Sequence, residues 1–214
     1  MATDAASKAV NLRPIDIRPS QVGEPVYELA EKLYPRQGQW TPNAYFHLQI
    51  DRGVELVDGC LEFLPVPTEI HQAILIFFLN LLQEVVGERG RVMLAGLRVN
   101  TQGDNFREPD VVALLDRQSP KRGNKAWSGA DFALEIVSEG GESRDYMDKR
   151  LEYAAAGIAE YWIVDPQKKQ ILVLSLEGQT YREVGTFTGN AEAAGPLLPG
   201  LRVTPEAVWA AAEK

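Results

Sequence analysis

The chain has 214 residues, of which 45% are hydrophobic and 24% are charged, as is typical of a soluble globular protein. This length predicts one domain with or without extensions, and the single cysteine, Cys60, excludes an intrachain disulfide and a zinc site built from a cysteine cluster. The formal net charge of −8 argues against a surface that binds nucleic acid broadly.

The first residues contain no apolar run of the length of a signal peptide. The longest apolar stretch, residues 73–82, is interrupted by Asn80 and is far shorter than the ~20 residues of a membrane span. A single cysteine also favours a reducing compartment. We therefore expect a cytoplasmic protein that contacts no membrane.

The N-terminal part of the chain shows little pattern. Residues 1–24 carry no clear period, and we expect a tail or strap there, in front of a single domain at residues 25–214. Thr41 followed by Pro42 is a typical helix start, because the hydroxyl caps free amides and proline suits the first helical position. Residues 43–50 are therefore expected to be helical.

A hairpin and a long helix are expected next. Asp58 and Gly59 stand between two short apolar runs in residues 54–63, which strongly indicates a β-hairpin. The helix is expected from Thr68 to about Glu88. Apolar residues cover most of its surface, so we expect it to be buried between layers.

The second half of the chain alternates short apolar runs with one clear helix. The predicted strands are residues 92–99, 109–115, 132–137, 160–164 and 170–176, the last two forming a hairpin. Ser143 caps a helix predicted at residues 144–156, and Thr204 starts a last short helix. This order of elements predicts a mixed α/β sheet with helices packed on it.

One segment departs from the acidic character of the chain. From Arg89 to Lys125 there are eight basic and four acidic residues, which makes this segment +4 and leaves −12 for the remainder. A local basic patch on an acidic body fits selective binding of a polyanion, and a solvated loop fits the same composition equally well.

Two carboxylates interrupt apolar strands. Asp110 opens the strand predicted at residues 109–115, and Glu135 lies within residues 132–137, on the face of Ala133 and Val137. A carboxylate in an apolar strand is costly unless it is paired or binds a cation. Two carboxylates with water and substrate phosphate commonly hold Mg²⁺. Alternatively, Asp110 is a strand-edge residue and Glu135 forms a salt bridge to a neighbouring strand.

Lys149 lies on the helix predicted at residues 144–156. At about 100° per residue, it stands at the border of an apolar arc that contains Met147, Leu151 and Tyr153. From there its ammonium can reach inward beside the two acids or extend outward along Tyr153. Helix geometry alone favours the outward direction.

Several separated blocks of this sequence resemble the Uma-two family, which is assigned to the PD-(D/E)XK nuclease superfamily. The blocks are EPD at residues 108–110, LEIVS at residues 134–138 and SRDYMDKRLEYAAAGIAEYWIVDP at residues 143–166, with VELVDG at residues 54–59 and His71 upstream. The resemblance covers roughly residues 40–200 and is specific, because the blocks occur in the right order.

The resemblance implies a restriction-endonuclease-like α/β fold, with a four-stranded mixed core sheet flanked by helices. It also implies metal ligands at Asp110 and Glu135 and a contributing acid at Glu55. The usual superfamily lysine stands two residues after the second acid, where this chain has Val137. The family pattern moves that lysine to the next helix, where Lys149 matches it.

These features lead to the hypothesis of a DNA endonuclease that depends on Mg²⁺ or Mn²⁺. Asp110, Glu135 and the backbone carbonyl of Ile136 would hold the ion, which activates water and polarises the phosphate. Lys149 would orient that water or neutralise the transition state. His71 is either a phosphate contact or general base, or a structural residue in the first turn of a buried helix.

Contacts to the DNA backbone would come from the basic segment, at Arg117, Lys121, Arg122 and Lys125. A homodimer is compatible with double-strand cutting. The main alternative is a non-catalytic nuclease-fold protein that acts as a DNA-binding or dimerisation module, because fold does not fix function. A metal-dependent hydrolase acting on another substrate is the third class.

Overall fold

The computed structural model describes residues 33–213. Gln37–Lys214 forms one compact unit. The tail expected at residues 1–24, and the domain boundary beside it, lie outside the described residues.

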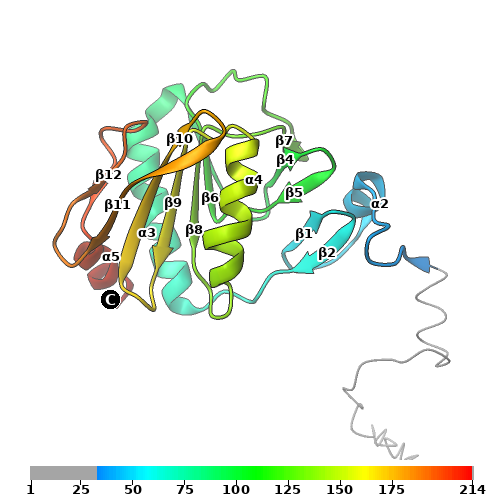
Figure 1. Ribbon diagram of the computed structural model, residues 1–214, viewed down its shortest axis with the longest axis horizontal. Coiled ribbons are helices and arrows are strands. Elements are labelled where there is room, and N and C mark those ends of the chain that lie inside the picture. Colours follow the sequence, from blue (N-terminus) through cyan, green and yellow to red (C-terminus); the bar gives the residue numbers. More distant parts are fainter. Residues whose placement is uncertain (1–32, 214) are drawn as a thin grey trace, which may run out of the picture. The chain divides into compact units, whose positions relative to one another are not determined.

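The centre of the compact unit is a six-stranded mixed sheet (Figure 1). Only β8 and β9 run parallel, and the other neighbouring pairs are antiparallel. The strand order is β11 (Thr180–Thr188), β10 (Gln170–Glu177), β9 (Glu160–Asp165), β8 (Phe132–Ile136), β6 (Val111–Leu114) and β3 (Arg91–Leu94). The mixed core sheet expected from the resemblance is therefore present and is extended by a hairpin.

Helices cover both faces of this sheet. Figure 1 shows α3 (Glu69–Val86) and α4 (Lys149–Ala155) on opposite sides of it. α3 and the C-terminal α5 (Pro205–Ala212) share one core cluster, and α4 belongs to the other. Every residue of β6, β8 and β9 is buried, which explains why these strands are apolar almost throughout.

A second, five-stranded sheet packs beside the first. Its order is β2 (Cys60–Phe63), β1 (Val54–Val57), β5 (Asn105–Arg107), β4 (Arg98–Gln102) and β7 (Ala126–Trp127). The hairpin predicted at Asp58-Gly59 is confirmed, and both turn residues have positive φ, at 48° and 71°. The short helix α2 (Pro42–His47) packs its buried Tyr45 against this sheet and ends three residues earlier than expected.

Two predictions about strands are wrong. The strand expected at residues 92–99 is two strands, β3 and β4, which belong to different sheets. Gly96 has a φ of 92° in the turn between them, a conformation that ends a strand at little cost only for glycine. The loop expected after residue 115 contains β7, which pairs parallel with β4. The smaller β12 (Ala193–Ala194) and β13 (Arg202–Val203) form a two-stranded sheet that we did not predict.

The long helix is confirmed, with Thr68 accepting a hydrogen bond from the amide of His71 as its N-cap. Its burial is less complete than expected, because Ile70 and Ile76 are more than half exposed. By length and composition alone, Glu69–Arg89 would suffice to cross a membrane, so the short apolar stretch at residues 73–82 does not by itself exclude a span. In this fold, its inner face packs into the core through Ile74, Phe78 and Leu82.

Candidate active site

Antiparallel pairing of β6 and β8 brings the two carboxylates together. Val111 lies opposite Leu134, so Asp110, directly before β6, comes beside Glu135 on β8. Asp110 Oδ2 accepts a hydrogen bond of 2.7 Å from the amide of Ile136, which fixes its carboxylate at the end of β8. Both acids line the same pocket. Glu135 thus lies on β8 as expected, whereas Asp110 lies one residue before β6 instead of opening that strand.

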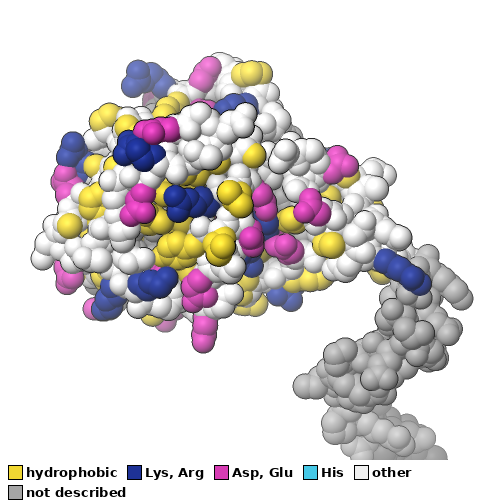
Figure 2. Space-filling model, viewed as in Figure 1, with side chains coloured by type: hydrophobic (Ala, Val, Ile, Leu, Met, Phe, Trp, Pro, Cys, Tyr) yellow, Lys and Arg dark blue, Asp and Glu magenta, His cyan; other side chains and the backbone are white. Residues whose placement is uncertain are grey.

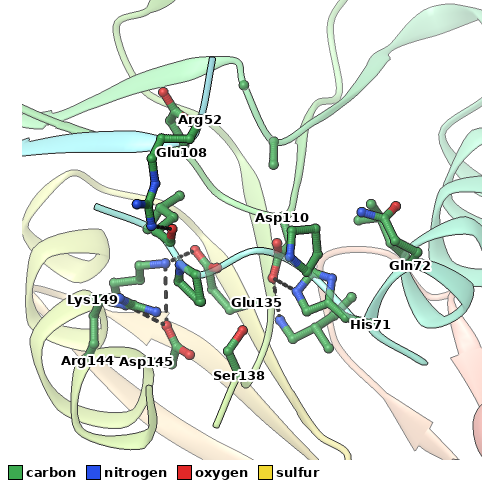
Figure 3. Close-up of a pocket in the computed structure, with 18 of the residues that line it drawn as sticks. Arg52, His71, Gln72, Glu108, Asp110, Glu135, Ser138, Arg144, Asp145 and Lys149 are labelled. Atoms are coloured by element: carbon green, nitrogen blue, oxygen red, sulfur yellow. Dashed lines mark hydrogen bonds and ion pairs between the residues drawn. The ribbon is translucent and has the colours of Figure 1, made fainter. Parts of the chain in front are cut away.

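Lys149 turns inward to this pocket. Its Nζ lies 2.9 Å from Glu135 Oε1, 3.4 Å from Asp145 Oδ1 and 3.7 Å from Glu55 Oε1. Only 2% of the residue is exposed. Figure 3 shows Glu135 between Lys149 and Asp110. The outward direction that helix geometry favoured is therefore wrong.

The inner face of this helix differs from the apolar arc expected from the sequence. The turn η2 (Arg144–Asp148) is a π-helix, in which the Lys149 amide donates to the carbonyl of Arg144, five residues back. The inner face carries Asp145, Lys149 and Tyr153, which are spaced four residues apart and are all buried. Met147 and Leu151, which we placed in the apolar arc, are 64% and 71% exposed. Such π-turns are frequent at functional sites.

Burial and charge strongly perturb this cluster. Burial raises the pKa of Glu135 to about 8, with Lys149 lowering it and Asp110 and Asp145 raising it. Burial also raises the pKa of Asp145, against the opposing effect of Lys149. For Lys149, burial lowers the pKa but the surrounding carboxylates outweigh it, so the pKa is raised. Lys149 is therefore a permanent cation at neutral pH. The tyrosine hydroxyl of Tyr153 completes the cluster by donating to Glu135 Oε1 at 2.5 Å.

Glu55 lies behind Lys149 and is fully buried. Its Oε1 accepts from the amide of Glu108 at 2.9 Å, and its Oε2 accepts from Arg107 Nη1 at 2.8 Å. Although burial raises its pKa, Lys149 and Arg107 outweigh that effect and lower it. Both oxygens are thus engaged, and Glu55 does not line the pocket. It supports Lys149 and is poorly placed to hold a second ion.

Arg107 joins the second sheet to α4. This buried guanidinium on β5 pairs with Glu55 on β1, with Glu62 on β2 at 2.7 Å and with Glu152 on α4 at 2.5 Å. Because Glu55 in turn contacts Lys149, the ion pairs run continuously from the second sheet to the pocket.

His71, at the start of α3, also reaches the site. Its Nε2 lies 3.2 Å from Asp110 Oδ2, and it lines the pocket. Burial lowers the pKa of His71, but the hydrogen bond and charge of Asp110 outweigh it and raise the pKa. Its Nδ1 is buried and has no hydrogen-bond partner. His71 therefore lies beside the catalytic candidates and contacts the same oxygen of Asp110 as the amide of Ile136.

The four residues of the basic segment that were expected to bind DNA do not reach this pocket, although Arg98 of the same segment lines it. None of the four residues expected to bind DNA lines it, namely Arg117, Lys121, Arg122 and Lys125. Lys121 instead pairs with Asp131 at 2.8 Å, and Arg122 borders a separate groove. On the face seen in Figure 2, acidic and basic side chains are interspersed over the described residues. The expectation that this segment positions DNA at the two acids is not supported by the geometry.

Other residues line the pocket that sequence reasoning missed. Its described cations are Arg52, Arg98, Arg144 and Lys149, and its carboxylates are Asp51, Glu108, Asp110, Glu135 and Asp145. Asp145 could have been found, because it stands one helical turn before Lys149, where side chains share a face. The position of Arg52 could not be predicted from a helical or strand period, because Arg52 lies on a loop.

A mixed sheet between helices, with paired acids where two central strands meet, is the restriction-endonuclease-like fold. The chain belongs to the Uma2 (Uma-two) family, described as "Putative restriction endonuclease", whose match covers residues 42–206. It also resembles the crystal structure of "a putative nuclease belonging to DUF820" from Anabaena variabilis ATCC 29413. That likeness has a TM-score of 0.68 at 20% identity, over 80% of this chain and 98% of that chain, and it shows the fold alone. No curated protein matches.

Proposed function

We propose that this protein is a DNA endonuclease that uses Mg²⁺ or Mn²⁺, with Asp110 and Glu135 as metal ligands and Lys149 as the catalytic cation. The observation that carries the proposal is the convergence of these three side chains, from two strands and a helix, in one pocket. The family membership supports nuclease chemistry, and the geometry supports the choice of residues.

The residues present suit a divalent cation of the magnesium type. No group of three or more His, Cys, Asp or Glu residues in the described part of the chain is arranged to hold a metal by itself. Mg²⁺ typically binds one or two protein carboxylates and takes its other ligands from water and substrate phosphate. Burial raises the pKa of Glu135, and the buried Asp145 Oδ1 has no hydrogen-bond partner. A cation bound beside Asp110 and Glu135 would favour the ionised form of Glu135.

When bound, such an ion lowers the pKa of a water molecule and polarises the phosphate. The chain itself orients the carboxylates: Ile136 and His71 hold Asp110, and Tyr153 and Lys149 hold Glu135. Lys149 remains protonated at neutral pH, so it acts as a hydrogen-bond donor to developing negative charge and not as a base. Burial around Glu135 excludes water and strengthens these interactions.

A cleavage assay tests the proposal directly. We expect nicking or linearisation of supercoiled DNA with MgCl₂ or MnCl₂, and none with EDTA. Asp110→Asn should abolish cleavage because it removes one metal ligand. The matched control is Glu192→Gln, an acid-to-amide change at an exposed residue outside the pocket.

The alternative outcome is equally informative. If wild-type protein binds DNA in a gel-shift assay but cuts neither supercoiled nor linear DNA with either metal, the non-catalytic DNA-binding module is the correct interpretation. A homodimer is part of the proposal only for double-strand cleavage, and sedimentation velocity would reveal it.

A further inference from the structure

Arg144 carries a buried hydrogen-bond donor without an acceptor. Its Nε is buried and unpartnered, and the nearest carboxylate oxygen, Asp145 Oδ1, is 3.8 Å away, beyond hydrogen-bonding distance. The residue lines the pocket that contains Asp110 and Glu135. A buried N–H without a partner costs free energy, so native proteins rarely leave one unless a ligand or water completes it.

The pocket's other described cations are already engaged. Lys149 lies among three carboxylates. Arg52 Nη2 donates to the carbonyl of Leu64 at 2.6 Å. Arg98 Nε lies 3.5 Å from Glu108 Oε1, and its guanidinium stacks over the Tyr45 ring at 4.2 Å. Arg144 is therefore the pocket cation best able to accept a new anionic partner.

The guanidinium of Arg144 lies close to Gly141 in the loop before η2. A Cβ atom on Gly141 would lie 3.1 Å from Arg144 Nη2 and 3.1 Å from the carbonyl oxygen of Ser138. Glycine at this position thus allows the guanidinium to lie directly against the loop. Figure 3 shows Arg144 on the same side of the pocket as Asp145 and Lys149, across from His71. Because Arg144 lines the same pocket as Asp110 and Glu135, a ligand bound to it lies in the pocket of the proposed reaction.

We propose that Arg144 is a substrate-binding residue that holds a phosphate of the nucleic-acid backbone, with its Nη–H groups donating to the non-bridging oxygens. The inference rests on the proposed function, because it identifies the ligand as a phosphodiester from the chemistry of that site. Arginine suits the task, since its planar guanidinium offers two parallel donors that match two phosphate oxygens. Arg144 also forms a long ion pair with Asp145, in which Nε lies 3.8 Å from Oδ1, whereas Lys149 Nζ lies 3.4 Å from the same oxygen.

The first experiment needs no nuclease activity. The Nε–H signal of Arg144 is recorded by two-dimensional ¹H–¹⁵N NMR of the full chain and assigned by its absence from Arg144→Lys. Titration with inorganic phosphate, and separately with the dinucleotide pTpT, should shift this signal saturably while that of Arg182 stays in place. Arg182 is an exposed arginine that pairs with Glu177 away from the pocket. A signal that moves with neither ligand overturns the inference.

The second experiment measures steady-state cleavage of a short labelled duplex with MgCl₂. Arg144→Lys keeps the charge and removes the forked geometry, so KM should rise roughly 10- to 100-fold, as for loss of hydrogen bonds to a charged group. The change in kcat should be smaller, because the residue binds substrate in the ground state as well. Arg182→Lys is the matched control and should leave both constants unchanged.

The two proposals fail in different ways. If wild-type protein cleaves DNA and Arg144→Lys has the same KM as wild type, the role of Arg144 is refuted and the nuclease function stands. If wild-type protein cleaves no DNA, the nuclease function is refuted, and the NMR titration still decides whether Arg144 binds phosphate.

Discussion

Replacing Glu135 with glutamine removes an ionisable group whose pKa burial raises to about 8, against an ordinary value of 4.5. The folded protein therefore holds a proton on Glu135 between these two values, whereas the unfolded chain has lost it. The stability from this proton is fully present below pH 4.5 and is lost as the pH rises through about 8. The loss is on the order of 5 kcal/mol, since each pKa unit corresponds to about 1.4 kcal/mol.

Urea unfolding in EDTA at a series of pH values measures this effect. The free energy of unfolding of the wild type should fall between pH 5 and pH 9 by several kcal/mol more than that of Glu135→Gln, on the order given by the same conversion. The glutamine side chain cannot ionise, so the unfolding free energy of Glu135→Gln lacks this dependence on pH. Glu177→Gln, an acid-to-amide change at a residue whose side chain is 60% exposed, is the control and should follow the wild type.

Magnesium should reverse the trend in the wild type alone. The ion binds the ionised carboxylate, so its apparent affinity should rise about tenfold per pH unit below pH 8, and MgCl₂ should stabilise the protein most at high pH. Parallel pH profiles for wild type and Glu135→Gln would refute the reasoning, because Glu135 would then be ionised throughout. Equal stabilisation of both proteins by MgCl₂ would refute its role as a metal ligand.

Three further substitutions test the buried network. Lys149→Met leaves the neighbouring carboxylates without their cation, so it should lower the free energy of unfolding by ~3–5 kcal/mol at pH 8 and by less at pH 5. It should also abolish cleavage, and full activity would exclude Lys149 from catalysis. Arg107→Met removes the buried cation that pairs with Glu55, so it should lower the free energy of urea unfolding by the same ~3–5 kcal/mol. A decrease below ~1 kcal/mol would show that the ion-pair network does not contribute to stability. Tyr153→Phe removes a hydrogen bond to Glu135 and should cost ~1–3 kcal/mol, with a lower melting temperature by calorimetry; an unchanged melting temperature would contradict the hydrogen bond.

Local pattern determined much of this protein. Asp58-Gly59 predicted the hairpin, because positive φ at two successive turn residues is a local requirement. Thr68 predicted the start of α3 for a similarly local reason, since a cap satisfies the amides of its own helix. Asp110 and Glu135 were visible as candidates because a carboxylate within an apolar strand is costly in any fold.

Tertiary structure decided what these residues contact. Gly96 sends β3 and β4 into different sheets, and no periodicity in residues 92–99 reveals that division. Packing sets which face of the helix at residues 144–155 turns inward, because Asp145, Lys149 and Tyr153 are buried whereas Met147 and Leu151 of the expected arc are exposed.

The ion pairs that hold the site were equally hidden in the sequence. Arg107 lies 52 residues from Glu55 and 45 from Glu152 along the chain, yet it binds both. Such a contact depends on how two sheets and a helix pack, and burial then sets its strength by excluding water. Residue types could therefore nominate the acids and the lysine, whereas only packing could surround Lys149 with carboxylates and leave Arg144 with an unpaired donor.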